Sequence, residues 1–262
     1  MHTKIKPINK EHAVQEVSFS LQLSENLTES SIARLIELKE VLKNEFSFGG
    51  DLKLQINPDQ FIGNKPANIP ENTIVGIILR NVQENGKVDW AVQAMQNIIA
   101  VSCSDYKGWK KTWPKARTYL ETLAGQVIDT NPIKVINLQY TNLFISPSSS
   151  SVDLSQLLNF RSHYLSENIK KTNSLWHMFQ GWLEEDAILK CKCLNNLNLA
   201  TTFKDQDFIT SITLLRQAQL GEESFDLERL DGVMNQLHVN LKKILENILT
   251  LDMARAIGLN NE

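Results

Sequence analysis

A chain of 262 residues that is 42% hydrophobic and 22% charged can bury a large core, which excludes a wholly disordered protein. Its formal net charge of −3 lacks the basic excess typical of nucleic-acid-binding proteins. No apolar run approaches the ~18 residues of a membrane span, and segment 1–10 has no signal-peptide core, so we expect a cytoplasmic protein that does not enter a membrane. The three cysteines fit neither a disulfide framework nor a metal site, and we expect no metal and no cofactor.

In the first part of the chain, strand and helix patterns follow one another. Apolar residues recur at every second position in the strand segments and at every third or fourth position in the helix segments. The Asn85-Gly86 pair predicts a tight hairpin, and Gly49-Gly50 predicts a turn. Because proline is tolerated near the start of a helix, Pro114 suggests a helix that begins near Trp113. We expect strands over 14–23, 52–56, 73–82, 88–95, 98–102 and 133–146, helices over 28–42 and 106–123, and a loop over 57–72.

Ser146-Pro147, followed by four serines, is the clearest linker and divides the chain into predicted halves, 1–146 and 152–262. A loop inside one compact domain would have the same composition. Beyond it we expect a short helix over 154–160, strands over 175–183, 187–203 and 208–217, and a final helix over 226–258. The middle strand is expected to contain a turn at Asn195-Asn196. An apolar stripe runs along the final helix through Leu230, Val233, Leu237, Leu241, Ile244, Ile248 and Leu251.

Runs of strands separated by three widely spaced helices indicate an α+β fold. We expect a largely antiparallel, curved sheet packed against three principal helices, the last of them long and C-terminal. The apolar stripe of that helix must be buried against the chain's own sheet or against another chain. The second arrangement would be a homodimer through the C-terminal helix.

Four short motifs follow one another along the chain. They are Ser104-Asp105-Tyr106-Lys107-Gly108-Trp109, Gln139-Tyr140-Thr141-Asn142, Leu237-His238 and Ile257-Gly258. In this order and at this length, the chain resembles a sporadically distributed bacterial family of conserved proteins for which no activity is established. The patchy distribution of that family is similar to that of accessory genes in defence islands. The resemblance therefore implies binding to a protein partner, such as the product of a neighbouring gene. Family members usually carry arginine where this chain has Gln139.

Two features could bind a ligand or nucleic acid. His238, at the edge of the apolar stripe, is either a general base or a histidine packed at the edge of the core, and the absence of a recognisable nucleophile beside it favours the second. The basic cluster 107–117 resembles a nucleic-acid surface, but the spacing of Trp109 and Trp113 favours inward packing of both rings. The candidate binding residues are Tyr106, Trp109, Lys110, Lys111, Tyr140, Asn142 and His238.

The sequence contains no Gly-rich phosphate loop, no Gly-x-Ser-x-Gly and no His-Glu-x-x-His, so we predict no catalytic residue. We interpret Glu184-Glu185-Asp186 as a solvated turn rather than the acid pair of a hydrolase. The leading hypothesis is a non-enzymatic interaction or sensing component of a bacterial accessory system, defence or toxin–antitoxin-like. The alternatives are a nucleic-acid-binding module that uses 106–117 and a hydrolase or nuclease of unrecognised type. A deep pocket lined by His238, Tyr140 and Asn142 would favour a ligand, whereas a flat apolar patch would favour a protein partner.

Overall fold

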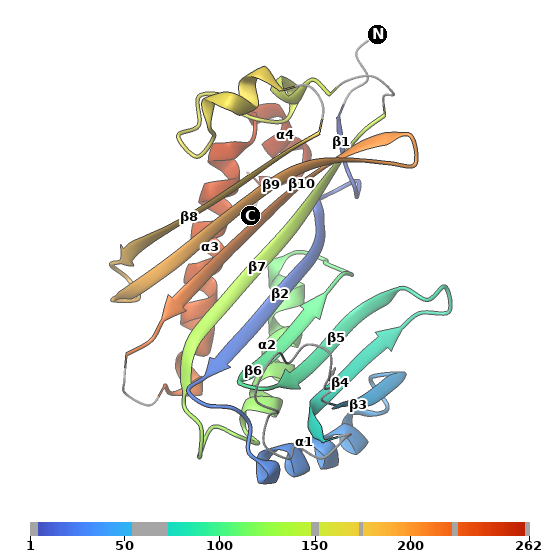
Figure 1. Ribbon diagram of the computed structural model, residues 1–262, viewed down its shortest axis with the longest axis vertical. Coiled ribbons are helices and arrows are strands. Elements are labelled where there is room, and N and C mark those ends of the chain that lie inside the picture. Colours follow the sequence, from blue (N-terminus) through green and yellow to red (C-terminus); the bar gives the residue numbers. More distant parts are fainter. Residues whose placement is uncertain (1–4, 54–72, 148–151, 173–174, 222–224, 260–262) are drawn as a thin grey trace, which may run out of the picture.

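The computed structural model describes residues 5–53, 73–147, 152–172, 175–221 and 225–259. Within these residues the chain forms one ten-stranded antiparallel sheet and four α-helices, which confirms the expected α+β class. The sheet is open and curved, and α2 and α3 cover one of its faces (Figure 1). The strands are β1 (Lys6–Pro7), β2 (Val14–Leu23), β3 (Phe48–Lys53), β4 (Ile74–Val82), β5 (Val88–Met95), β6 (Ile98–Cys103), β7 (Ile133–Ser146), β8 (Trp176–Asp186), β9 (Cys191–Lys204) and β10 (Asp207–Gln219). The helices are α1 (Glu29–Leu42), α2 (Trp109–Ala124), α3 (Leu230–Ile248) and α4 (Leu251–Ala256).

Two groups of strands extend in opposite directions from the central pair of β2 and β7. On one side the order is β6, β5, β4 and β3, and on the other side it is β10, β9 and β8. In each group the strand next to the centre comes last in the sequence, and a helix follows it: α2 after β6, and α3 after β10. Both helices return across the same face of the sheet (Figure 1). This repeated arrangement brings α2 and α3 together against the central strands.

The sheet continues across the serine-rich segment. β7 ends at Ser146, before this segment, and pairs along most of its length with β10, which lies after it. Residues 148–151 lie outside the described residues. The division of the chain into two halves at 146–152 stays a prediction.

Alternating burial explains the central strands. In β7, Ile136, Leu138 and Tyr140 are buried on the face that the helices cover, while the residues between them are half-buried on the other face. Leu120 of α2 and Leu237 of α3 join the same core, so the apolar stripe of the last long helix is covered by the chain itself. The free energy of burying these faces explains why the elements follow the periodicity of the sequence.

The final helix is shorter than the sequence predicts. α3 ends at Ile248, and Thr250 begins the separate helix α4 by accepting a hydrogen bond from the Met253 N–H at 3.3 Å. The break is held from outside the helix, because the Thr250 N–H donates to the carbonyl of Leu157 at 2.9 Å. Leu251 consequently leaves the apolar stripe and is 71% exposed.

The expected turns at Asn195-Asn196 and Gly49-Gly50 are wrong. Asn195-Asn196 lies within β9, where β8 and β10 pair with it on both sides, and Gly49-Gly50 lies in β3, paired with β4. The turn after β8 instead forms at 187–190, where Lys190 adopts a φ of 54°. Strands on both sides satisfy the backbone of Asn195-Asn196, and pairing with β4 on one side holds Gly49-Gly50 extended, so tertiary pairing overrides both turn preferences.

Pro114 lies inside α2, which begins at Trp109 rather than near Trp113. Pro114 cannot donate a backbone hydrogen bond, and the first turn of the helix before it is joined to α3 through the contacts of Trp109 with His238 and Asn235. The short helix expected over 154–160 is only a 3₁₀ turn over Leu154–Gln156. Residues 54–72, which include the end of an expected strand and the loop over 57–72, lie outside the described residues. No helix in the described part of the chain is long and apolar enough to cross a membrane.

Candidate functional site

Helices α2 and α3 contact each other through aromatic and amide side chains. The Trp109 indole is parallel to the His238 imidazole, with ring centroids 4.2 Å apart and an interplanar angle of 3°. The Trp109 N–H donates to Asn235 at 2.7 Å, and the Trp113 N–H donates to Asp231 at 2.7 Å. The earlier tryptophan of α2 thus contacts the later residue of α3, and the later tryptophan contacts the earlier one, so α2 and α3 are antiparallel. The contacts satisfy the donor of each buried indole, and both rings pack inward as their spacing predicted.

His238 also contacts the sheet. Its Nδ1 lies 3.0 Å from the hydroxyl oxygen of Tyr140 on β7. Burial, and then the charge of Lys242, lowers the pKa of His238 to about 4, so its imidazole is neutral at neutral pH. Two residues along β7, Asn142 shares the inward face and donates to the carbonyl of Ile212 at 3.3 Å. The Tyr140–His238 contact therefore joins the sheet to the helix layer, and Asn142 is held within the sheet.

A pocket of about 480 Å³ lies where these residues meet, and we call it the α2–α3 pocket. This volume falls within the range of small-molecule sites. Its walls come from the start of α2, the middle of α3, the inward face of β7, the N-terminal segment 9–14 and the C-terminal segment 257–259. The backbone oxygen of Glu11 lies 3.7 Å from the position of a Cβ at Gly258, so the two terminal segments lie close together.

All four motifs that carry the family resemblance contribute to this pocket. Tyr106 comes from the first motif, Tyr140 and Asn142 from the second, His238 from the third and Gly258 from the fourth. These motifs are separated by up to about 150 positions in the sequence, and the fold brings them to one place. A pocket lined by Tyr140, Asn142 and His238, one of the two outcomes that the sequence left open, is therefore present.

The side wall of the pocket is aromatic. The ring of Tyr106 meets His12 edge-on with centroids 5.4 Å apart, and it meets Tyr140 edge-on at 5.9 Å. Burial lowers the pKa of His12, outweighing the backbone hydrogen bond at Tyr106, so His12 is also mainly neutral at pH 7. Leu241 and Leu245 add apolar surface from α3. A ligand here would meet planar and aliphatic groups on its sides.

The charged groups of the pocket are mostly lysines. Among its described lining residues Glu11 is the sole acid, and it stands against four lysines, which gives a local charge of +3 in a chain with a formal charge of −3. Lys107 pairs with Asp105 at 2.8 Å, whereas Lys10 and Lys111 form no ion pair with a described residue. The four are Lys10, Lys107, Lys111 and Lys242. Such a concentration of one sign of charge attracts anions.

The candidate residues separate into two groups in the structure. Tyr106, Lys111, Tyr140, Asn142 and His238 line the pocket. Two others do not. Trp109 lies buried behind His238, and Lys110 points to solvent outside the pocket.

Sequence reasoning missed His12 and Lys242, which also line the pocket. His12 lies in the segment before β2, and Lys242 lies on α3 one helical turn after His238. Neither belongs to a recognisable local motif. The spacing of His238 and Lys242 on one helix face was the one available signal.

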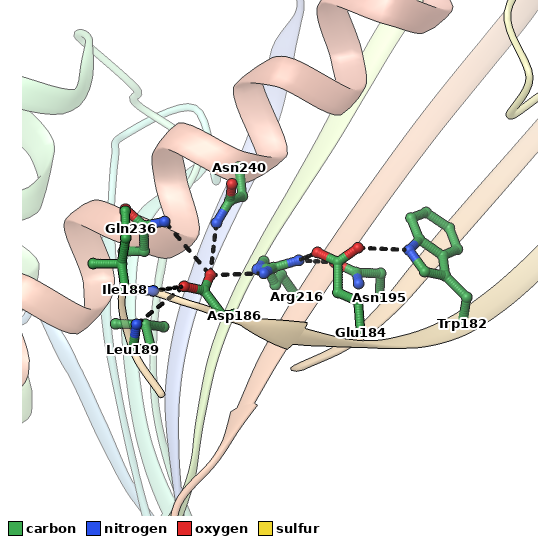
Figure 2. A network of polar contacts seen from close by, with 9 residues as sticks. All are labelled: Trp182, Glu184, Asp186, Ile188, Leu189, Asn195, Arg216, Gln236 and Asn240. Atoms are coloured by element: carbon green, nitrogen blue, oxygen red, sulfur yellow. Dashed lines mark hydrogen bonds and ion pairs between the residues drawn. The ribbon is translucent and has the colours of Figure 1, made fainter. Parts of the chain in front are cut away.

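A second polar cluster lies between α3 and the strands β8 to β10 (Figure 2). Arg216 of β10 is buried and forms ion pairs with Glu184 and, at 2.8 Å, with Asp186 of β8. It also donates to Asn195 of β9 at 2.6 Å, and Asn240 of α3 donates to Asp186 at 2.9 Å. The cluster thus joins three strands to the long helix.

The interpretation of Glu184-Glu185-Asp186 as a solvated turn is wrong. Glu184 and Asp186 belong to β8, and Asp186 is buried. Burial raises the pKa of Asp186, but the N–H of Leu189 and the guanidinium of Arg216 outweigh this effect and lower it. The carboxylate oxygens of Asp186 accept hydrogen bonds from Arg216, Asn240 and the turn after β8. The cluster therefore serves as structural support.

Within the described residues, no three His, Cys, Asp or Glu side chains form a group that could hold a metal ion. Comparisons with family models, with curated proteins and with solved structures gave no match to this chain. The resemblance to the bacterial family stays a prediction.

Proposed function

We propose that this protein is a sensing component that binds a small organic anion in the α2–α3 pocket. The observation that carries the proposal is the convergence of the four motifs on one pocket with a net positive lining. The four motifs are far apart in the sequence, and their meeting at one pocket supports a shared role in binding. The proposed role in a bacterial accessory system rests on the family resemblance.

The chemistry of the walls defines the class of ligand. Lys111 and Lys242 can each donate charge-assisted hydrogen bonds to a phosphate or carboxylate. Tyr106 and Tyr140 offer rings to a planar or apolar body, and Asn142 offers an amide for orientation. The ligand is therefore an anion attached to an organic group, about the size of a mononucleotide.

Binding without turnover fits the composition of the pocket. None of its described lining residues is a serine, threonine or cysteine, so no aliphatic hydroxyl or thiol nucleophile faces the ligand, and the hydroxyl of Tyr140 lies 3.0 Å from His238. His238 is held between Trp109 and Tyr140, and its low pKa makes it a weak base. These features indicate that His238 shapes the pocket and does not transfer protons.

A bound ligand would also join distant parts of the chain. α2 follows the first group of strands, α3 follows the second group, and the two terminal segments complete the walls. An anion that contacts Lys10, Lys111 and Lys242 together would hold these segments in one arrangement. A protein partner would then recognise the arrangement of the terminal segments that the ligand stabilises.

The test is calorimetric titration with adenosine monophosphate and with naphthoate, which carry a phosphate and a carboxylate on planar bodies. Adenosine and naphthylmethanol are the uncharged controls. We expect at least one anion to bind more tightly than its uncharged counterpart. Replacing Lys111→Gln together with Lys242→Gln should weaken that binding by about tenfold or more, because a hydrogen bond to a charged group contributes ~1.5 kcal/mol or more.

The matched control removes two charges from the same helices outside the pocket. Lys110 and Lys243 neighbour the two pocket lysines in the sequence but are not part of its lining. Lys110→Gln with Lys243→Gln should change the affinity by less than about threefold, because these two charges lie outside the pocket and salt screens their interaction with the ligand. Equal losses in both double variants, or equal binding of charged and uncharged probes, would contradict the proposal.

A further inference from the structure

β8 is an exposed edge of the sheet. Each of its residues from Trp176 to Asp186 is paired with β9 on one side, and no described strand pairs with its other side. Figure 1 shows this strand at the outer border of the sheet. Its backbone therefore presents a row of N–H and C=O groups that a further strand could pair with.

The middle of β8 lacks the usual protection of an edge strand. Proteins usually block an edge strand with proline, charged side chains, a bulge or a short length. β8 runs for 11 residues without proline, lysine or a register shift against β9, and its charged residues, Glu184, Glu185 and Asp186, are confined to its last three positions. On the face away from the helices, Phe179 is 63% exposed and Leu183 is 61% exposed. Large apolar side chains on an open edge favour pairing with another strand.

We propose that β8 pairs antiparallel with β8 of a second copy of this chain, with Gly181 opposite Gly181 of that copy. The two sheets would then continue into one another across a two-fold axis perpendicular to the sheet. This inference is independent of the ligand proposed for the α2–α3 pocket.

The register follows from the alternation of the strand. The odd-numbered residues of β8 from His177 to Glu185 face away from the helices. Residues opposite each other in an antiparallel pair lie on the same face, so an odd-numbered residue must oppose an odd-numbered one. Centring the pair on Gly181 sets Phe179 opposite Leu183 and His177 opposite Glu185.

The neighbouring registers lack this complementarity. With Gln180 at the centre, His177 would oppose Leu183 and Phe179 would oppose Gly181. With Trp182 at the centre, Phe179 would oppose the carboxylate of Glu185. Only the Gly181 register matches apolar with apolar and imidazole with carboxylate along the outward face.

Self-complementarity is the reason to prefer a second copy over an unrelated extended peptide. A two-fold axis makes each favourable pair occur twice, so the Phe179–Leu183 and His177–Glu185 pairs provide four cross-strand contacts from one short sequence. Gly181 places no side chain at the two-fold axis. A Cβ at this position would lie 2.8 Å from the carboxamide oxygen of Asn196 on β9, so glycine is the residue that fits here. The strand is thus complementary to itself along its length.

The experiment measures self-association of the full chain by sedimentation velocity over about a hundredfold range of concentration. We expect a reversible dimer of twice the 29.8 kDa chain mass. His177→Glu should raise the dimer dissociation constant by about tenfold, because it places like charges opposite each other twice. The double variant His177→Glu with Glu185→Lys should restore the dimer to within about threefold of the original, because it reverses both charges.

Two further variants separate edge pairing from a general loss of apolar surface. Leu183→Lys should abolish the dimer, whereas Val41→Lys should not, although Val41 is a 72% exposed residue on α1. Circular dichroism and thermal unfolding of each variant are the controls that establish whether it is folded. A monomer at every concentration, failure of the double variant to restore association, or a monomer that instead binds an extended apolar peptide through β8 would overturn the proposal.

Discussion

The neutral imidazole of His238 predicts that the folded chain loses stability as the pH falls. The pKa of His238 is lowered from 6.5 to about 4 by burial, so the folded chain resists a proton that the unfolded chain accepts. Above pH 6.5 the imidazole is neutral in both states and the full stability is present. Between pH 6.5 and about 4 the unfolded state binds the proton first, and the free energy of unfolding decreases.

The size of the loss follows from the same displacement of the pKa. A change from 6.5 to about 4 corresponds to about 3 kcal/mol by pH 4, with a slope of at most ~1.4 kcal/mol per pH step. This is a large part of the stability of an ordinary domain. Other groups titrate nearby: burial lowers the pKa of His12 and raises the pKa of Glu16. The contribution of His238 must therefore be measured as a difference between two proteins.

The assay is urea unfolding of the original chain and of His238→Gln at steps of about one pH unit from about 7.5 to about 4. Glutamine is neutral throughout and can still reach the Tyr140 hydroxyl, so the other titrations are common to both proteins. At pH 7.5 the variant is expected to be less stable, because it loses the stacking on Trp109. As the pH falls, this difference should shrink or reverse. Parallel curves over the whole range would refute a neutral, buried His238.

Two further substitutions test the core and the buried ion pair by urea unfolding. Leu237→Ala should lower the free energy of unfolding by about 2 to 5 kcal/mol because Leu237 is fully buried, while Leu251→Ala should change it by less than about 0.5 kcal/mol because Leu251 left the stripe; similar effects of the two would contradict the break between α3 and α4. Arg216→Met should cost about 3 to 5 kcal/mol by leaving the Asp186 carboxylate buried without its cation, and adding Asp186→Asn should recover part of that loss. An additive double variant would mean that the two side chains are not coupled.

Local patterns predicted the elements best where burial repeats along one segment. The alternation in β7 and the hairpin at Asn85-Gly86 were found at the predicted positions, because each needs only neighbouring residues to be recognised. The turn predicted at Asn195-Asn196 was wrong because strands on both sides supply hydrogen-bond partners for this dipeptide. The end of α3 was missed because it depends on Leu157, far away in the sequence.

The candidate site shows the same division. The sequence by itself determined the fold class, the inward packing of Trp109 and the position of His238 at the edge of the stripe, since these follow from the period of apolar residues along one helix or strand. Only the tertiary structure decided that Tyr106, Tyr140 and Gly258 share one pocket with His238. A pocket is made by contacts between distant segments, and its shape and charge depend on how helices and strands pack, which no local period records.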